Sequence, residues 1–289
     1  MKRKTIVRLG LLALLGLVAA GGYWLWQQQK PTLNPVSLAG TDPAPPAATE
    51  PVPAPAPARA EPAIAHPLEP ASGASPGLRP LPAADKADAY VSAALVDLLG
   101  RKAVLTFLST DRFAARLVAT VDNLDRPHAA ARLWPVNPTA ARFVTEPAAD
   151  GTQIGARNAA RYAPVVQFIT SIDAARAVAL YKQIYPLVQP AYEELGSPGK
   201  YFNDRLVQVI DHLLQTPEPA GPVKVRLTEV RGPLASATPW LRYEYADPTL
   251  EARSAGQKLL LRVGPDNARQ LKAKLAEVRG LIARAETPR

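Results

Sequence analysis

The order of the first 82 residues constrains this chain more than any other feature. A basic tip, Met1-Lys2-Arg3-Lys4, is followed by an apolar run without a charge, Leu9–Trp26. The next stretch, Pro31–Pro82, is rich in proline and alanine. This order is typical of a domain that is attached to a membrane through a long tether.

The apolar run is long enough to cross a bilayer as one helix. Its 18 residues, at ~1.5 Å each, reach roughly 27 Å. Basic residues precede it and only Lys30 follows closely, so the N-terminus is expected in the cytoplasm. We therefore predict that residues 1–30 form a cytoplasmic tip and a single-pass anchor in the cell inner membrane. The alternative is a cleaved signal peptide, because Val18-Ala19-Ala20 is an acceptable cleavage site.

The stretch 31–82 is predicted to be a disordered tether. It contains 15 of the 31 prolines of the chain, and proline lacks the N–H that helices and interior strands need. Such a sequence has almost nothing to bury and favours polyproline-II conformations. Fully extended, it would span roughly 160 Å at ~3.1 Å per residue.

Residues 83–289 are long enough to form a folded periplasmic domain, as one domain or two small lobes. The chain has no cysteine, which excludes disulfides, lipoprotein attachment, thiol nucleophiles and cysteine-based zinc sites. The net charge of +9 falls to about +6 for residues 81–289, because the basic tip contributes much of it. This surplus is weak evidence for an anionic partner, and nucleic acid is implausible outside the cytoplasm.

Apolar periodicity predicts a mainly helical (α+β) domain with one or two small antiparallel β-hairpins. Asp150-Gly151 suits a type I′ turn between 142–146 and 152–154. The alternating segments 223–230 and 241–245 are expected to pair. Pro186 and Pro190 should kink or split the helix that contains them. The helices are expected near 85–99, 102–108, 113–124, 158–169, 173–195, 203–214, 248–262 and 265–285.

Two catalytic motifs match only formally. Gly73-Ala-Ser-Pro-Gly77 fits G-x-S-x-G, but the residue after the serine is proline, which has no N–H for an oxyanion hole. Ser197-Pro-Gly-Lys200 fits S-x-x-K, but Pro198-Gly199 predicts a turn where a helix should begin. No metal-binding spacing and no glycine-rich phosphate loop occurs. We therefore assign no catalytic, cofactor-binding or metal-binding residue, and we expect no cofactor.

Polar and aromatic residues near the middle of the domain leave weaker alternatives. Glu193-Glu194 could supply the acid of a glycosidase, although such a pair before a helix end is usually solvated. His212 follows Asp211, but neighbouring residues on a helix do not face each other. The stripe Tyr181, Tyr185, Val188 and Tyr192 could stack on a sugar, but aromatic residues at helical spacing are usually core.

The candidate partner-binding residues are Tyr201, Asn203, Asp204 and Arg205. They follow a tight reversal at the start of a predicted helix, where free N–H groups can donate hydrogen bonds to a ligand or to a capping side chain. The alternative is structural: Asn203 caps the helix, Phe202 packs into the core, and Asp204 complements the helix dipole.

Several local strings together resemble a known family. They include Leu98–Val104, Phe113–Leu124, Tyr192–Leu206, Val209–Leu214 and Tyr245–Gly264. Over roughly residues 82–280 the chain resembles bacterial membrane-anchored proteins of domain-of-unknown-function family 3014. The resemblance implies a Gram-negative envelope setting, and it implies no activity, cofactor or catalytic residue.

These observations lead to two hypotheses about function. The first is a single-pass inner-membrane protein with a periplasmic binding or scaffold domain, whose partner is an envelope protein, peptidoglycan or a lipid head group. The second is a cell-envelope hydrolase that uses unidentified carboxylates. Convergence of Glu193, Glu194, Asp204, Asp211 and His212 in one cleft, with perturbed pKa values, would favour the enzyme.

Overall fold

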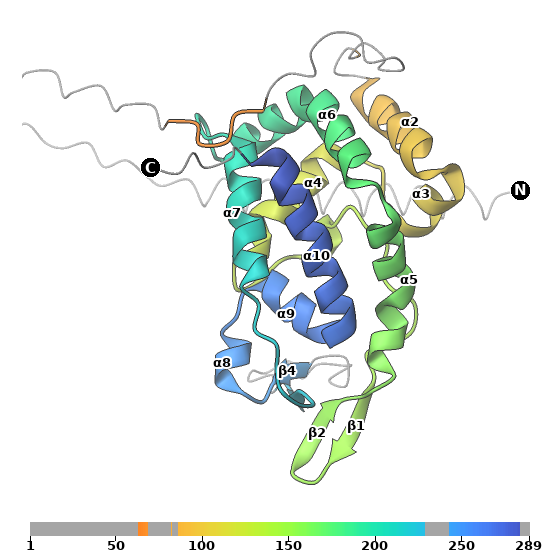
Figure 1. The fold of residues 1–289 in the computed structure, drawn as a ribbon, viewed down its shortest axis with the longest axis vertical. Helices are drawn as coiled ribbons and strands as arrows, with labels where there is room; N and C mark the ends of the chain where they lie inside the picture. Colours follow the sequence, from red (N-terminus) through yellow and green to blue (C-terminus); the bar gives the residue numbers. More distant parts are fainter. Residues whose placement is uncertain (1–62, 69–81, 83–85, 229–242, 284–289) are drawn as a thin grey trace, which may run out of the picture. The chain divides into compact units, whose positions relative to one another are not determined.

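The computed structural model describes residues 63–68, 82, 86–228 and 243–283, which belong to one compact unit, Arg59–Arg289. Nine α-helices and four short strands are assigned within these residues (Figure 1). The prediction of a mainly helical domain is therefore confirmed. The helices are α2 Ala87–Leu99, α3 Arg101–Phe107, α4 Phe113–Leu124, α5 Asn158–Ser171, α6 Ala174–Glu194, α7 Phe202–Leu214, α8 Pro248–Glu251, α9 Ala255–Arg262 and α10 Pro265–Ile282.

The predicted hairpins combine into one antiparallel sheet in the order β1-β2-β3-β4. The strands are β1 Thr145–Ala148, β2 Gly151–Ile154, β3 Lys224–Leu227 and β4 Tyr243–Tyr245. The pairing of Thr152 with Val225 joins the two hairpins. The prediction of a type I′ turn is wrong. Ala148 pairs with Gly151, so Ala149 and Asp150 are the central residues of the turn, and neither has the positive φ that a type I′ turn requires.

The largest apolar core lies between α2, α4, α6 and α7. It includes Val118, Val188 and Phe202, each fully buried. The helix α10 packs against α5, α6 and α7 and closes this body on another side (Figure 1). The sheet has its own small core of Val225, Tyr245 and Leu261.

Two helical segments, 173–195 and 248–262, differ from their predicted extent or continuity. Of the predicted kink or split at Pro186 and Pro190, the split is wrong, because the helix α6 continues through both residues. The segment expected to form one helix over 248–262 is divided, because Ser254 accepts a hydrogen bond from Gln257 N and caps a new helix, α9. Asp247 caps α8 through Thr249 N.

Among the described residues no single helix is long and apolar enough to cross a membrane. The pair α5 and α6, bent by 76°, passes that test of length and composition together. The run Leu9–Trp26, predicted as the anchor, lies outside the described residues.

Candidate functional site

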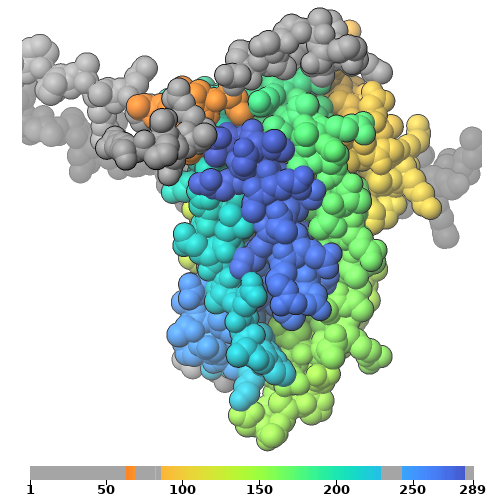
Figure 2. Space-filling view, in the orientation of Figure 1, coloured from red at the N-terminus to blue at the C-terminus, as the bar shows by residue number. Residues whose placement is uncertain are grey.

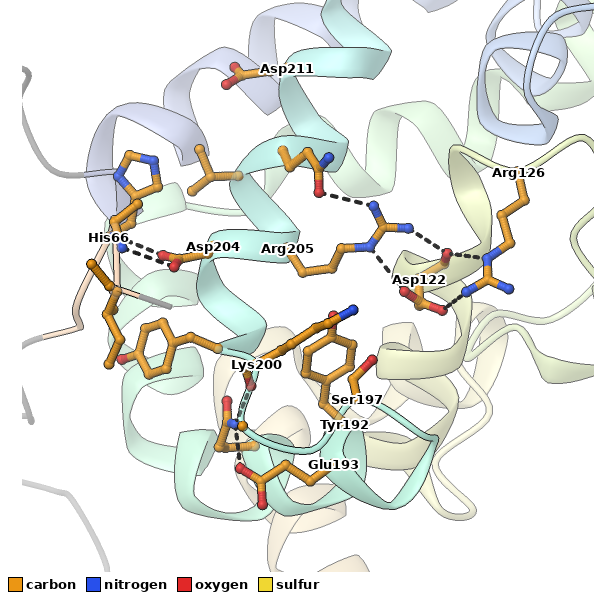
Figure 3. Close-up of a pocket in the computed structure, with 18 residues that line it drawn as sticks. His66, Asp122, Arg126, Tyr192, Glu193, Ser197, Lys200, Asp204, Arg205 and Asp211 are labelled. Carbon is orange, nitrogen blue, oxygen red and sulfur yellow. Dashed lines mark hydrogen bonds and ion pairs between the residues drawn. The ribbon is translucent and has the colours of Figure 1, made fainter. Parts of the chain in front are cut away.

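A groove of about 880 Å³ opens beside the N-terminal half of α7 (Figure 3). We call it the α7 groove. Residues from α4, the end of α6, the turn before α7 and the N-terminal segment 63–66 line it. Two smaller cavities, of about 240 and 60 Å³, lie elsewhere, near Gly221 and Val223. The lining residues of the α7 groove include Asp122, Arg126, Tyr192, Glu193, Lys200, Tyr201, Asp204, Arg205 and Gln208.

A tight reversal between α6 and α7 forms one wall of the groove. Gly196 and Gly199 have positive φ values of 101° and 69°, which glycine adopts without a steric penalty. Lys200 N donates to Ser197 O at 3.2 Å and closes the turn. Ser197 therefore belongs to a turn and does not begin a helix, as S-x-x-K catalysis would require.

Asn203 does not cap α7, so that part of the structural prediction is wrong. Tyr201 occupies the N-cap position without a side-chain cap, and the free N–H of Phe202 donates instead to Gln189 Oε1 of α6 at 2.9 Å. Asn203 lies one residue further into the helix and is fully buried. Its Nδ2 donates to Ile282 O at 3.0 Å and to His66 O at 2.8 Å.

The neighbouring polar groups bind the main chain of Ala63–Leu68, which we call the docked segment. Asp204 accepts from Ala65 N at 2.9 Å and from His66 N at 2.7 Å. The Tyr201 hydroxyl accepts from Leu68 N at 2.9 Å. The docked segment belongs to the predicted tether, so at least this part of the tether is held against the domain rather than disordered (Figures 2 and 3).

Arg205 points the opposite way and binds α4. Its guanidinium makes two hydrogen bonds of 2.7 Å to the Asp125 carboxylate and one of 3.0 Å to Asp122. Partial burial disfavours the charged guanidinium, but the bonds and charges of Asp125 and Asp122 outweigh it and raise the pKa of Arg205. This network also includes Arg126, which binds Asp122 at 2.5 Å.

Three tyrosines surround Asn203. Tyr181 donates to Asn203 Oδ1 at 3.3 Å, and its ring contacts that of Tyr185, which in turn contacts Tyr201. Burial raises the pKa of the Tyr181 and Tyr185 hydroxyls well above their ordinary value, and the neighbouring Tyr201 adds to it. The tyrosine stripe of α6 packs on the largest core, as predicted, and Tyr192 is only 3% exposed.

The acidic residues and His212 do not converge in one cleft. Glu193, Asp204 and Asp211 line the α7 groove, whereas Glu194 and His212 are not among its lining residues. Asp211 forms an ion pair with Arg279, Glu193 accepts from Gln189 at 2.7 Å, and His212 contacts Ser254 Oγ at 2.9 Å. In the part of the chain that the structure describes, no group of three metal-ligating side chains occurs.

The docked segment and Gln189 were not predicted from the sequence. One signal was present for the docked segment: Ala63–His66 is free of proline and contains Ile64, in a stretch where prolines are frequent. No signal marked Gln189, because its role depends on how α6 and α7 meet. Partner binding by Tyr201, Asn203, Asp204 and Arg205 stays a prediction.

Comparison with known proteins places the chain in a family without an assigned role. The model of the family described as "Protein of unknown function (DUF3014)" matches residues 113–279. The chain belongs to this family. The family expected from the sequence is thereby confirmed, whereas its membrane-anchored envelope setting stays a prediction. Neither a curated protein nor a solved structure matches the chain. The matched range contains α4, α6 and α7, whereas the docked segment precedes it.

Proposed function

We propose that the chain is a single-pass inner-membrane protein whose residues 83–289 form a periplasmic binding or scaffold domain. Its binding site is the α7 groove, and its partner is an envelope protein. The observation that supports this most is the capture of the docked segment. The first turn of α7 presents side chains that bind the main chain of a peptide that bends at Ala65 and His66.

The chemistry of the groove favours a polypeptide over the other two expected partners. Asn203, Asp204 and Tyr201 bind peptide N–H and C=O groups, which every polypeptide offers. A lipid head group would call for a cluster of basic residues, but acidic and basic residues alternate around this groove. Peptidoglycan would call for exposed stacking rings, and Tyr192 is buried instead.

The proposed location is supported by the sequence alone. The basic tip and the apolar run Leu9–Trp26 agree with an anchor followed by a periplasmic domain. No observation on the described residues favours the alternative of a hydrolase, because Glu193, Asp204 and Asp211 each already have a partner within the protein.

The function is tested by photo-crosslinking of the full chain in living cells. A photoreactive amino acid is placed at Gln208, which is exposed at the groove, and separately at Leu105, which is 69% exposed on α3. The proposal predicts a discrete crosslinked envelope protein from position 208 and none from position 105. Equal patterns from both positions would contradict a binding site in the groove.

Topology is tested separately with reporters fused after Arg289. They should be active only outside the cytoplasm, and the mature chain should keep Met1–Trp26 and sediment with membranes. A soluble chain that begins near Gly21 would contradict the anchor and support a cleaved signal peptide.

A further inference from the structure

We propose that the docked segment can be displaced from the side chains at the start of α7 that it occupies beside the α7 groove. The partner is then a polypeptide that bends as Ala65–His66 does, with free N–H groups at two successive residues and at the second residue after them. This inference rests on the proposed function and names the class of peptide that the groove takes. The partner binds the same side chains of α7 only when Ala63–Leu68 leaves them.

The hydrogen bonds of the docked segment define the pattern that a partner must match. Ala65 N and His66 N both bind Asp204, and Leu68 N binds Tyr201. Pro67 lies between the second and third of these donors, where no N–H is used. Proline is therefore acceptable at that one position and excluded at the other three, because it has no N–H to donate.

The docked segment is held without a large apolar anchor. Ile64 is 50% exposed, and Ala63, Ala65 and Pro67 are exposed as well. Leu68 alone packs on an apolar cluster, formed by α6, α7 and α10. Burial of apolar side chains is the main source of binding energy, so this segment should open at a low cost in free energy.

The groove is larger than the docked segment needs. Ala63 to His66 form one wall, and about 880 Å³ of open space remains between this wall, Tyr192, Lys200 and Gln208 (Figure 3). That volume is in the range of ligand-binding clefts. A longer partner can bind the α7 side chains and also fill this space, which gives it an advantage over the docked segment.

Competition within one chain reduces the apparent affinity for a partner. A short connection gives the docked segment an effective concentration on the order of 1 mM. If the groove is free for a fraction of the time, the apparent dissociation constant rises by the inverse of that fraction. Weakening the docked segment without changing the groove should therefore tighten the binding of a peptide added in solution.

The experiment measures binding of a fluorescent peptide with the sequence of residues 60–70 to the purified full chain. Ala65→Pro removes one of the two N–H groups that bind Asp204 and changes no side chain of α7. His66→Pro removes the other and serves as a second variant. Ala48→Pro is the matched control, because it adds a proline to the predicted tether outside the docked segment. Fluorescence anisotropy reports the dissociation constants, and circular dichroism checks that each variant is folded.

We expect Ala65→Pro and His66→Pro to bind the peptide at least about tenfold more tightly than the wild type and Ala48→Pro. Adding Asp204→Asn to Ala65→Pro should remove this binding. Displacement would be overturned if the wild type and the three single variants bound the peptide with equal affinity, or if none of them bound it. Concentration-dependent dimers of the wild type that Ala65→Pro abolishes would assign the groove to a second copy and also overturn the proposal. None of these outcomes decides the result of the crosslinking experiment, which tests the proposed function separately.

Discussion

The first turn of α7 has two sides that bind different parts of the chain. On one side, Asn203 and Asp204 bind the main chain of Ala63–Leu68. On the other side, Arg205 binds the carboxylates of Asp122 and Asp125 on and after α4. The Arg205 side joins ionised side chains through two parallel hydrogen bonds to Asp125, a geometry specific to a guanidinium and a carboxylate. The Asn203–Asp204 side recognises peptide groups, which a different polypeptide offers equally well, so this side is suited to exchange.

The largest effect is expected from Asn203→Ala, which removes a fully buried amide from the Asn203–Asp204 side. The change leaves Ile282 O buried without its donor and creates a cavity, so the free energy of unfolding should fall by about 3 kcal/mol. Urea denaturation checks this value. Asn158→Ala, at an equally buried asparagine that binds Val144 N and Arg262 O, is the matched control. It should destabilise the fold without releasing the docked segment.

Arg205→Ala tests the opposite side. It removes both parallel bonds to the partly buried Asp125 and leaves Asp122 with Arg126 as its cation, so we expect a loss of about 2 kcal/mol in the free energy of unfolding. Arg205→Lys should restore only part of it, because lysine cannot make the two parallel bonds to Asp125. If Arg205→Ala instead releases the docked segment and leaves stability unchanged, the division between the two sides is wrong.

Alkaline pH should weaken the Asn203–Asp204 side through Tyr181. Burial raises the pKa of this hydroxyl in the folded chain, whereas the unfolded chain loses the proton near pH 10. The stabilising contribution is therefore complete below about pH 10 and declines as pH rises further. Denaturation at several alkaline pH values should show a steeper loss in the wild type than in Tyr181→Phe. Parallel slopes in the two chains would contradict this role for Tyr181.

The smallest effect on stability is expected from Asp204→Ala. The carboxylate is solvent-accessible in part and its main partners are two N–H groups of the docked segment, so the loss should be about 0.5 kcal/mol. Release of residues 63–68, seen as faster proteolysis near Ala65, should accompany it. A large loss of stability with the segment still protected would make Asp204 a structural residue of α7.

Much of the helical fold could be predicted because local signals and tertiary packing agree. Phe113–Leu124 and the stripe of α7 have apolar faces that are buried as expected. The predictions were wrong or incomplete where packing between elements distant in the sequence determines the structure. Pro186 and Pro190 remain inside α6, and the pairing of Thr152 with Val225 joins two hairpins across about 70 residues.

Partner binding by Tyr201, Asn203, Asp204 and Arg205 stays a prediction. The structure shows that Tyr201, Asn203 and Asp204 bind the main chain of the docked segment. That this peptide is Ala63–Leu68 could not be predicted, because a contact across more than 130 residues leaves no periodic signal. Asn203 was misassigned as a cap because Gln189 supplies that function from another helix.

Hydrogen–deuterium exchange of the full chain tests the central claim most directly. The amides of Ala65, His66 and Leu68 should exchange more slowly than those of Thr49 and Glu50 in the predicted tether. In Asp204→Ala, their protection should be lost while the amides of Val209 and Ile210 in α7 stay protected. Equal exchange of the docked segment in the wild type and in Asp204→Ala would contradict the account, because the α7 groove would then not bind that main chain.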